Sequence, residues 1–416
     1  MRKIILFLLL YPKFLFSQPS SHTLVGSTGQ TYSTVMVWVP FLCDIDVKVK
    51  SKRDTCWIDS KKITGASSSN KFEFAQLLPE TDYEYLVTTT LGDTMVGKFR
   101  TFNKIEKNIP PSNIRISAGS CSWTQRGKND SDLVVFNSIL SGDPDLMLWL
   151  GDNVYLVDGE WQNASSIELR YSQFRDNQQV KNLIGQVPNL SVWDDHDFGP
   201  NDGVGSFSGS KMSGEIFSKM WSNPPSYVNG NPNLKVFSHS IEDISIFGID
   251  NRTQRTLTDT KNPQMLSRLQ IDWLIENLKF HKKSTHKIIM CGSQVLNDQK
   301  VYENFSNFPK ERRYLLSQII KHKIEGVIFL TGDRHHSEIS VYEKRGIKIW
   351  DVTTSPLTSG VSSVLGEKNN LRVENSLVKQ KGFATLTFFG NYQNRECLVE
   401  FKNKNGKKIL EYIVKK

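Results

Sequence analysis

The sequence predicts a small all-β sandwich domain followed by a larger α/β domain. Two patterns predict this order. Residues 20–105 alternate apolar and polar side chains in short stretches separated by turn-forming residues, which is typical of half-buried strands. From residue 113 onward, short and fully apolar runs alternate with longer amphipathic stretches. This second pattern is typical of buried strands connected by helices.

The composition is that of an ordinary globular protein with a large core. The 416 residues are 38% hydrophobic, 11% aromatic and 23% charged, which excludes a disordered, collagen-like or coiled-coil chain. Five cysteines are too few for a disulfide scaffold. The formal net charge is +9, but lysines and arginines are scattered, with a denser run only between Lys402 and Lys416. A solvated face or an edge strand explains that run, so we expect no specific nucleic-acid binding.

The first residues have the pattern of an export signal. Two basic residues, Arg2 and Lys3, precede an apolar run, Ile4–Tyr11, and small or polar residues follow from Ser17. We interpret residues 1–17 as a signal peptide, since the apolar run is too short to span a bilayer. A buried first strand or an uncleaved anchor is the alternative. Because a twin arginine and a lipobox cysteine are absent, we expect Sec-type export to the periplasm or the extracellular space, with no transmembrane anchor.

The first domain, residues 20–105, contains no evident catalytic motif. The segment Phe74–Tyr85, followed by Gly97–Thr101, resembles the end of a fibronectin type III domain. In that family the Leu-Pro-x-Thr-x-Tyr run, which here ends at Tyr83, makes a tyrosine corner. Cys43 and Cys56 both fall in this domain, where they either pair or remain free thiols. A segment with two prolines, residues 103–112, then serves as the linker.

The second domain, residues 113–416, shows the alternation of strands and helices. The candidate strands are the apolar runs Ile114–Ala118, Leu146–Leu150, Leu190–Trp193, Ile244–Ile249, Ile288–Met290, Val327–Leu330 and Ile347–Trp350. The candidate helices are Leu133–Leu140, Ile167–Ile184, Met265–Phe280 and Arg312–His322. Apolar residues recur at helical spacing in the third of these helices, which indicates a core-facing stripe.

Polar side chains capable of binding metal or phosphate follow most of these strands. Because the carboxyl ends of strands in an α/β sheet form one binding edge, we expect these residues to converge on one site. Taken singly, each has an ordinary interpretation as a turn, a buried thiol or a surface pair. The residues that follow the strands are Cys121, Asp152, Tyr155, Asp194, Asp195, His196, Asp197, Asp250, Arg252, Asp333, His335 and His336.

The crowding of carboxylates at this edge predicts a polynuclear metal site. Four of them, from Asp152, Asp194 or Asp195, Asp197 and Asp333, would repel one another unless cations neutralised them. A thiolate, a phenolate and an imidazole suit Fe(III), whereas carboxylate oxygens suit Ca²⁺, Mg²⁺ or Mn²⁺, and Zn²⁺ is a further alternative. The zinc-hydrolase helix, the Walker A loop, the dinucleotide glycine motif and the serine nucleophile elbow are all absent from the sequence.

At these residues the sequence resembles the PhoD-like alkaline phosphatases, a branch of the metallo-dependent phosphatases. The resemblance runs through an ordered set of motifs between about residues 115 and 360. These motifs are Gly119-Ser120-Cys121-Ser122, Gly151-Asp152-Asn153-Val154-Tyr155, Trp193-Asp194-Asp195-His196-Asp197-Phe198, Asp250-Asn251-Arg252, Gln270-Ile271-Asp272-Trp273-Leu274, Gly332-Asp333-Arg334-His335-His336-Ser337 and Ser355-Pro356-Leu357-Thr358-Ser359-Gly360.

The resemblance implies a four-layer sandwich of two central sheets flanked by helices, and an Fe(III)–Ca²⁺ site that hydrolyses phosphate esters. His196 would be the general acid, and Arg252 would contact the phosphate, although Asn251 departs from the usual Asp-Thr-Arg. The implied iron ligands are Cys121, Asp152, Tyr155 and His335. The implied calcium ligands are Asp152, Asp195 and Asp333, with Asn201 or Asp202 at a second calcium site.

The predicted function is therefore that of a secreted metal-dependent phosphoesterase acting on small phosphate mono- or diesters. A purple acid phosphatase shares the Gly-Asp-x-x-Tyr motif and the β-sandwich, but it would need Gly-Asn-His-Asp and additional metal-binding histidines. A secreted binding module with purely structural metals is a second alternative. An enzyme acting on phosphodiesters or phospholipids is a third, since sequence alone does not decode the substrate loops.

Overall fold

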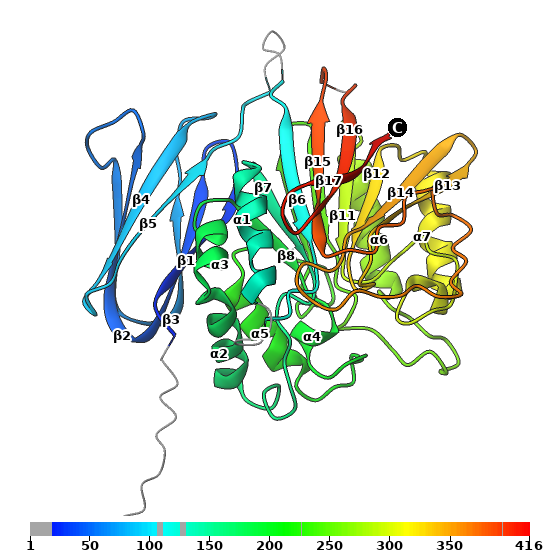
Figure 1. Ribbon diagram of the computed structural model, residues 1–416, viewed down its shortest axis with the longest axis horizontal. Coiled ribbons are helices and arrows are strands. Elements are labelled where there is room, and N and C mark those ends of the chain that lie inside the picture. The colour runs from blue at the N-terminus through cyan, green and yellow to red at the C-terminus, as the bar shows by residue number, and fades with distance from the viewer. Residues whose placement is uncertain (1–18, 106–110, 125–129, 226, 393) are drawn as a thin grey trace, which may run out of the picture.

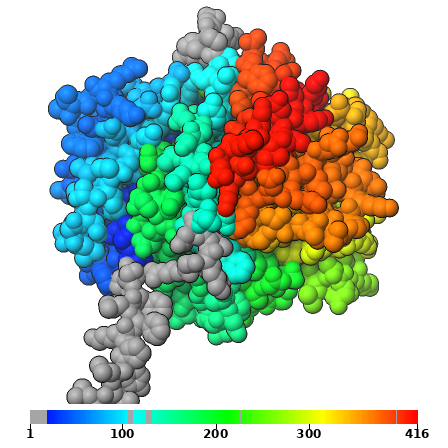
Figure 2. All heavy atoms as spheres, in the orientation of Figure 1, coloured from blue at the N-terminus to red at the C-terminus, as the bar shows by residue number. Residues whose placement is uncertain are grey.

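The computed structural model describes residues 19–105, 111–124, 130–225, 227–392 and 394–416. The predicted signal peptide, residues 1–17, lies outside the described residues. Within the described ranges, no helix combines the length and the apolar character needed to cross a bilayer. The N-terminal β domain and the α/β domain pack side by side, as Figures 1 and 2 show.

The N-terminal domain is one antiparallel sheet that bends along its longest strand. The first half of β2 pairs with β1 and the second half pairs with β4, while β3 runs alongside both halves. The buried face of this sheet is a core of valines and aromatic residues. The hydroxyl of Tyr83 accepts a hydrogen bond of 2.8 Å from the backbone N–H of Leu78, as in a tyrosine corner. The strands are β1 (His22–Thr28), β2 (Ser33–Ser51), β3 (Asp59–Phe74), β4 (Asp82–Thr89) and β5 (Thr94–Arg100).

The α/β domain contains two six-stranded sheets. In the first sheet β6, β7 and β8 are parallel, and in the second β10, β11, β12 and β14 are parallel. The first sheet has the order β17 (Lys408–Val414), β16 (Glu396–Asn403), β15 (Gly382–Phe389), β6 (Ile114–Gly119), β7 (Leu146–Leu150) and β8 (Asn189–Val192). The second has the order β13 (Glu338–Lys344), β14 (Ile347–Thr353), β12 (Val327–Thr331), β11 (His286–Cys291), β10 (Ile244–Gly248) and β9 (Phe237–Ile241).

Helices cover the outer face of each sheet, so the predicted four-layer sandwich is confirmed (Figure 1). The inner faces of the two sheets pack together through residues such as Leu148, Ile246 and Ile288. The first sheet is covered by α1 (Val134–Ser141), α2 (Ala164–Arg175), α3 (Gln178–Ile184) and α5 (Ser210–Met220). The second is covered by α6 (Arg268–Phe280) and α7 (Pro309–Lys321). The short elements are η1 (Asp130–Asp132), α4 (Asp195–Phe198) and η2 (Phe305–Asn307).

The bounds of two helices differ from the predicted ones, because polar residues inside the predicted stretches cap the observed helices. The stretch Ile167–Ile184 forms two helices, since Asn177 adopts an extended conformation and starts a new helix. The stretch Met265–Phe280 becomes helical only at Arg268, where the side chain of Ser267 accepts a hydrogen bond from the N–H of Gln270. Cys43 is buried, Cys56 is exposed, and both are free thiols.

Candidate metal centre

The carboxyl ends of the parallel strands bring the predicted ligands together. The Sγ atom of Cys121, after β6, lies 3.5 Å from Oδ2 of Asp152, after β7. The hydroxyl of Tyr155 donates to the same oxygen at 3.2 Å. Two groups of ligand atoms each lie within 4.8 Å of one another and share one carboxylate. They are Cys121, Asp152 and His335, and Asp152, Asp195 and His196.

The backbone at these strand ends is held in an unusual conformation. Cys121, Asp152, Asp333 and His335 all have positive φ, with values of 59°, 49°, 66° and 53°. A side chain costs energy in this left-handed region, and such residues cluster at functional sites. Glycine before Asp152 permits the close approach of β7 to β8, because a Cβ on Gly151 would lie 2.6 Å from the Cβ of Asp194.

Two serines fix the thiol and the phenol of this group. The Oγ of Ser355 lies 3.2 Å from Cys121 Sγ and accepts from the N–H of His335 at 3.0 Å, so it connects two predicted ligands. The hydroxyl of Ser359 donates to Tyr155 Oη at 2.9 Å. Burial raises the pKa of Cys121 to about 12 and that of Tyr155 well above its usual value. Both groups are therefore neutral unless a cation holds them deprotonated.

The carboxylates around the site also fit bound cations. Burial, followed by the charge of Asp194, raises the pKa of Asp333 to about 8. Burial raises the pKa of Asp194 to about 7, although the charge of Arg252 opposes this shift. The Oδ2 atoms of both residues are buried without a hydrogen-bond partner in the described structure. An unpaired buried carboxylate oxygen is costly in free energy, and a metal ion removes that cost. The donor set therefore fits a centre with more than one metal.

A cavity of about 590 Å³ opens over these groups. His196 is half-buried at its wall, and the imidazole ring lies 4.2 Å from the ring of Tyr155. Asp202 donates its backbone N–H to Asp195 Oδ2 at 2.8 Å and accepts from Asn201 at 2.9 Å, so both predicted second-site residues lie at the rim. The residues that line the cavity are Asp152, Asp195, His196, Asn201, Asp202, Tyr302, Glu303, Asp333, Arg334, His335, Gly360, Val361 and Ser362.

Two polar residues of the strand-end motifs are turned away from the cavity. Asp197 accepts from the N–H groups of Asn153 and Asp194 and from the hydroxyl of Tyr171, so it fixes the start of α4. His336 is fully buried, and Nδ1 lies 2.9 Å from the carbonyl of Arg334. Neither side chain lines the cavity.

Arg252 does not reach the cavity either. The side chain has no exposed surface, and the guanidinium pairs with Asp194 and with both oxygens of Glu303. A further bond of 3.2 Å goes to the carbonyl of Gly203. The resemblance implied a contact of Arg252 with phosphate, whereas in the structure the guanidinium binds these partners. Arg252 holds the side chain of Asp194, next to the predicted ligand Asp195.

Arg334 is a cation at the cavity to which the sequence analysis assigned no role. It lines the cavity and is only 4% exposed. Nη2 donates to Glu367 at 2.6 Å, whereas Nε and Nη1 are buried without a partner in the described structure. The guanidinium also lies 4.5 Å from the ring of Tyr302, which is 77% exposed. The signal was present in the Gly-Asp-Arg-His-His motif, but Tyr302 and Glu303 lie in an irregular loop that carries no such pattern.

A further group of potential ligands lies behind the cavity, and arginines already neutralise its carboxylates. His336, Glu338 and Glu367 come within 4.8 Å of one another. Glu338 pairs with Arg372, however, and Glu367 pairs with Arg334. Two arginines therefore occupy the place of a cation, and this group supports the position of Arg334.

Comparisons with known proteins agree with this geometry. Residues 233–405 match the family model described as PhoD-like phosphatase. A solved structure of PhoD aligns with a TM-score of 0.75 at 16% identity and covers 94% of this chain and 88% of its own. A purple acid phosphatase, PPD1 from yellow lupin (Lupinus luteus) seeds, aligns with a TM-score of 0.70 at 13% identity, over 95% and 74% of the two chains. These two likenesses show a common fold. No curated protein matches the sequence.

Proposed function

We propose that this chain, a PhoD-like phosphatase by the match of residues 233–405, is an exported enzyme that hydrolyses phosphate mono- or diesters at an Fe(III)–Ca²⁺ centre. One observation carries the assignment of the centre. Cys121, Asp152 and His335 come from three different strand ends, yet their ligand atoms gather within 4.8 Å beside a cavity. A thiol in this group favours a transition metal over a site made only of oxygen ligands.

The proposed ligands follow from the contacts of the site. Fe(III) would be held by the thiolate, the phenolate, the imidazole and one shared carboxylate, namely Cys121, Tyr155, His335 and Asp152. Ca²⁺ would be held by Asp152, Asp195 and Asp333, with Asn201 or Asp202 at a second calcium site; Mn²⁺, Mg²⁺ and Zn²⁺ are the alternatives to these metals. When bound, such ions supply charge neutralisation of the phosphate oxygens and lower the pKa of water for the attack.

The residues of this chain would bind the phosphate and deliver the proton. Arg334 lines the cavity, and its Nε and Nη1 atoms have no hydrogen-bond partner among the described residues, so we assign it the contact with the non-bridging oxygens. His196 at the cavity wall would give a proton to the leaving alkoxide as general acid. Tyr302 covers Arg334 and would limit the access of water to it.

The alternative hypothesis, a purple acid phosphatase, is less well supported. That type of centre needs several metal-binding histidines, and the histidines among the described residues of the cavity wall are His196 and His335. His336, the next in sequence, is buried behind the wall. A binding module with structural metals would not require an imidazole at the cavity surface, where His196 lies.

Elemental analysis of the purified protein, expressed with export intact, tests the proposal. We expect about one equivalent of iron and an excess of calcium in the wild type. Asp152→Asn should lose both metals together with hydrolysis of nitrophenyl phosphate esters, because its two oxygens serve both groups. Asp145→Asn is the matched control and should retain the metals, since that partly buried carboxylate accepts from the N–H of Arg115 at the opposite, amino end of β7. Zinc or manganese alone would discard the iron assignment of Cys121 and Tyr155. Metal without turnover would favour the binding module.

A further inference from the structure

The guanidinium of Arg334 is held on two sides, although the residue lines the cavity. Nη2 donates to Oε2 of Glu367 at 2.6 Å, and the ring of Tyr302 lies over the guanidinium, with its centroid 4.5 Å from Cζ. The side chains of Arg334 and Glu367 are only 1% and 5% exposed. In the part of the chain that the structure describes, Nε and Nη1 of Arg334 have no partner. A guanidinium fixed in this way keeps N–H groups available for a bound anion.

The carboxylate that holds Arg334 is itself held by an amide. Nδ2 of Asn297 donates to Oε1 of Glu367 at 2.6 Å and to Oε1 of Gln294 at 2.9 Å. Oδ1 of Asn297 accepts from the N–H of Gln299 at 3.0 Å, and the residue is fully buried. Because both ends of this amide are engaged, it cannot rotate without breaking hydrogen bonds. It therefore fixes the orientation of Glu367 and, through it, that of Arg334.

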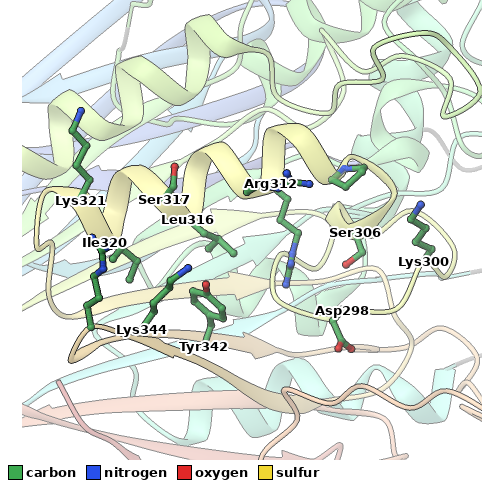
Figure 3. Close-up of a pocket in the computed structure, with 13 residues that line it drawn as sticks. Asp298, Lys300, Ser306, Arg312, Leu316, Ser317, Ile320, Lys321, Tyr342 and Lys344 are labelled. Atoms are coloured by element: carbon green, nitrogen blue, oxygen red, sulfur yellow. The ribbon is translucent and has the colours of Figure 1, made fainter.

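The loop that carries Asn297 is braced from its outer side. This loop, residues 292–304, connects β11 to η2 and borders a surface pocket (Figure 3). Arg312 extends from α7 toward the loop in Figure 3. It donates to the carbonyls of Val295 and Leu296 at 2.8 and 2.6 Å. The loop is thus a firm support for the amide of Asn297.

The connector between β14 and β15, which carries Glu367, is tied to the same loop and to the metal centre. Nδ2 of Asn370 donates to Asp298 of the loop at 2.8 Å. On the other side of Glu367, the N–H of Ser362 donates to the carbonyl of His335 at 2.8 Å. Ser362 also lines the cavity. The position of Glu367 is therefore fixed relative to the proposed ligands.

We propose that Glu367 and Asn297 are positioning residues for the binding of phosphate. Neither is among the described residues that line the cavity, so both act through Arg334. They hold the guanidinium in the orientation that leaves Nε and Nη1 available to the phosphate oxygens. The inference rests on the proposed function, in which Arg334 contacts the phosphate. An arginine that is ordered before the substrate arrives loses less side-chain freedom on binding than a mobile one.

Neutralisation of a buried charge is the competing explanation, since Glu367 forms an ion pair with Arg334. Neutralisation requires only a negative charge near the guanidinium and does not require Asn297. Positioning requires the full length of the glutamate side chain and the amide of Asn297. Variants that change these features and retain the net charge therefore distinguish the two explanations.

Glu367→Asp and Asn297→Ala test the inference. The first shortens the side chain by one methylene and the second removes the amide, and neither changes the net charge. Glu242→Asp is the matched control, because Glu242 forms a similarly buried pair with Arg395 in the turn before β10, at the amino end of that strand. The assays measure kcat and KM for nitrophenyl phosphate and the competitive inhibition constant of inorganic phosphate. Each variant is also measured in the Arg334→Met background.

Both variants should bind inorganic phosphate about tenfold more weakly, since a displaced guanidinium loses a charge-assisted hydrogen bond. KM should rise by a similar factor with kcat within about twofold of the wild type, because the contact is made equally in the ground state and the transition state. In the Arg334→Met background neither variant should change these constants further, since the positioned group is absent. The control should match the wild type in KM and in phosphate inhibition.

Two outcomes would overturn the inference. Unchanged phosphate inhibition in both variants would leave Glu367 with neutralisation alone. Equal weakening with and without Arg334 would show that the variants reach the cavity by another route. Retained metal content and kcat show that a variant is folded, and if one variant loses both, the other decides. Failure of the proposed function is a separate result, namely no hydrolysis of nitrophenyl phosphate by the wild type.

Discussion

Replacing Arg252 by methionine separates a structural role from a contact with substrate. Arg252 has no exposed surface and is held between Asp194 and Glu303. Methionine retains much of the side-chain volume but removes the charge. The variant leaves Glu303 paired with Arg255 at 2.9 Å, whereas Asp194 loses its cation and retains uncharged donors such as the amide of Asn251 at 2.8 Å.

The expected loss is one of stability. Removing one partner of a buried ion pair typically costs about 3–5 kcal/mol, because the remaining charge is buried without compensation. At about 2–4 °C per kcal/mol for large domains, the melting temperature should fall on the order of 10 °C. Arg268→Met is the control, since that arginine is largely exposed, pairs with Asp272 one helical turn away and lies 3.5 Å from the ring centroid of Tyr314. The loss of this exposed pair and of the exposed cation–π contact should stay within about 1 kcal/mol.

The assay combines thermal unfolding with steady-state kinetics below the transition of the variant. Arg252→Met should unfold early yet keep most of the kcat/KM of the wild type for nitrophenyl phosphate. Arg334→Met should show the opposite result, a raised KM with a smaller loss of stability, because Nε and Nη1 of this arginine have no partner among the described residues and face the substrate cavity. An Arg252→Met protein that melts like the wild type but loses activity would refute the reasoning and restore a contact with phosphate.

Three further variants test individual groups. His196→Ala should retain the metals and lose about 10²–10⁴ in rate on alkyl phosphates; steady-state assays should find nitrophenyl esters little affected, and equal losses on both would remove its role as acid. Ser359→Ala should move the visible band expected from iron-bound Tyr155 to longer wavelength, since the phenolate loses the hydrogen bond of 2.9 Å, whereas Ser362→Ala should leave the spectrum unchanged. His239→Gln should flatten the loss of stability below pH 6.5. Burial lowers the pKa of His239 to about 4, so between pH 6.5 and 4 the unfolded chain takes up a proton that the folded one excludes, and stability falls by about 3 kcal/mol. Urea unfolding at pH 7.5 and 4.5 measures this, and an unchanged pH dependence in the variant would contradict it.

The convergence of the site could be predicted because parallel strands share an orientation. Apolar runs ending at Cys121, Asp152 and Asp333 must place these residues at one edge of their sheets once the two sheets pack face to face. The order of the motifs along the chain then indicated the family fold. The alternation of strands and helices and the identity of the residue after each strand are sufficient to predict this convergence.

Which arginine lines the cavity could not be predicted in the same way. Arg252 follows a strand, as a ligand residue would, but Glu303 reaches it from a loop 51 residues later and binds the guanidinium. Arg334, and not Arg252, lies at the cavity, because Glu367, 33 residues further along the chain, accepts a hydrogen bond from its guanidinium. Such pairings depend on the paths of irregular loops, which have no hydrophobic period.

The strand ends also combine several features that destabilise the folded chain unless cations are bound. Four side chains have positive φ, each at a cost of about 1–3 kcal/mol, and two carboxylate oxygens are buried without partners. Since metal ions would bind the folded state and not the unfolded one, their removal by a chelator should lower stability by about 4 kcal/mol at a thousandfold excess over Kd. Differential scanning calorimetry before and after chelation measures the shift, which should be reversed by adding the metals back and should be absent in Asp152→Asn. If the wild type is shown to be metal-free and still melts at the original temperature, protonation alone neutralises the buried carboxylates and the prediction is wrong.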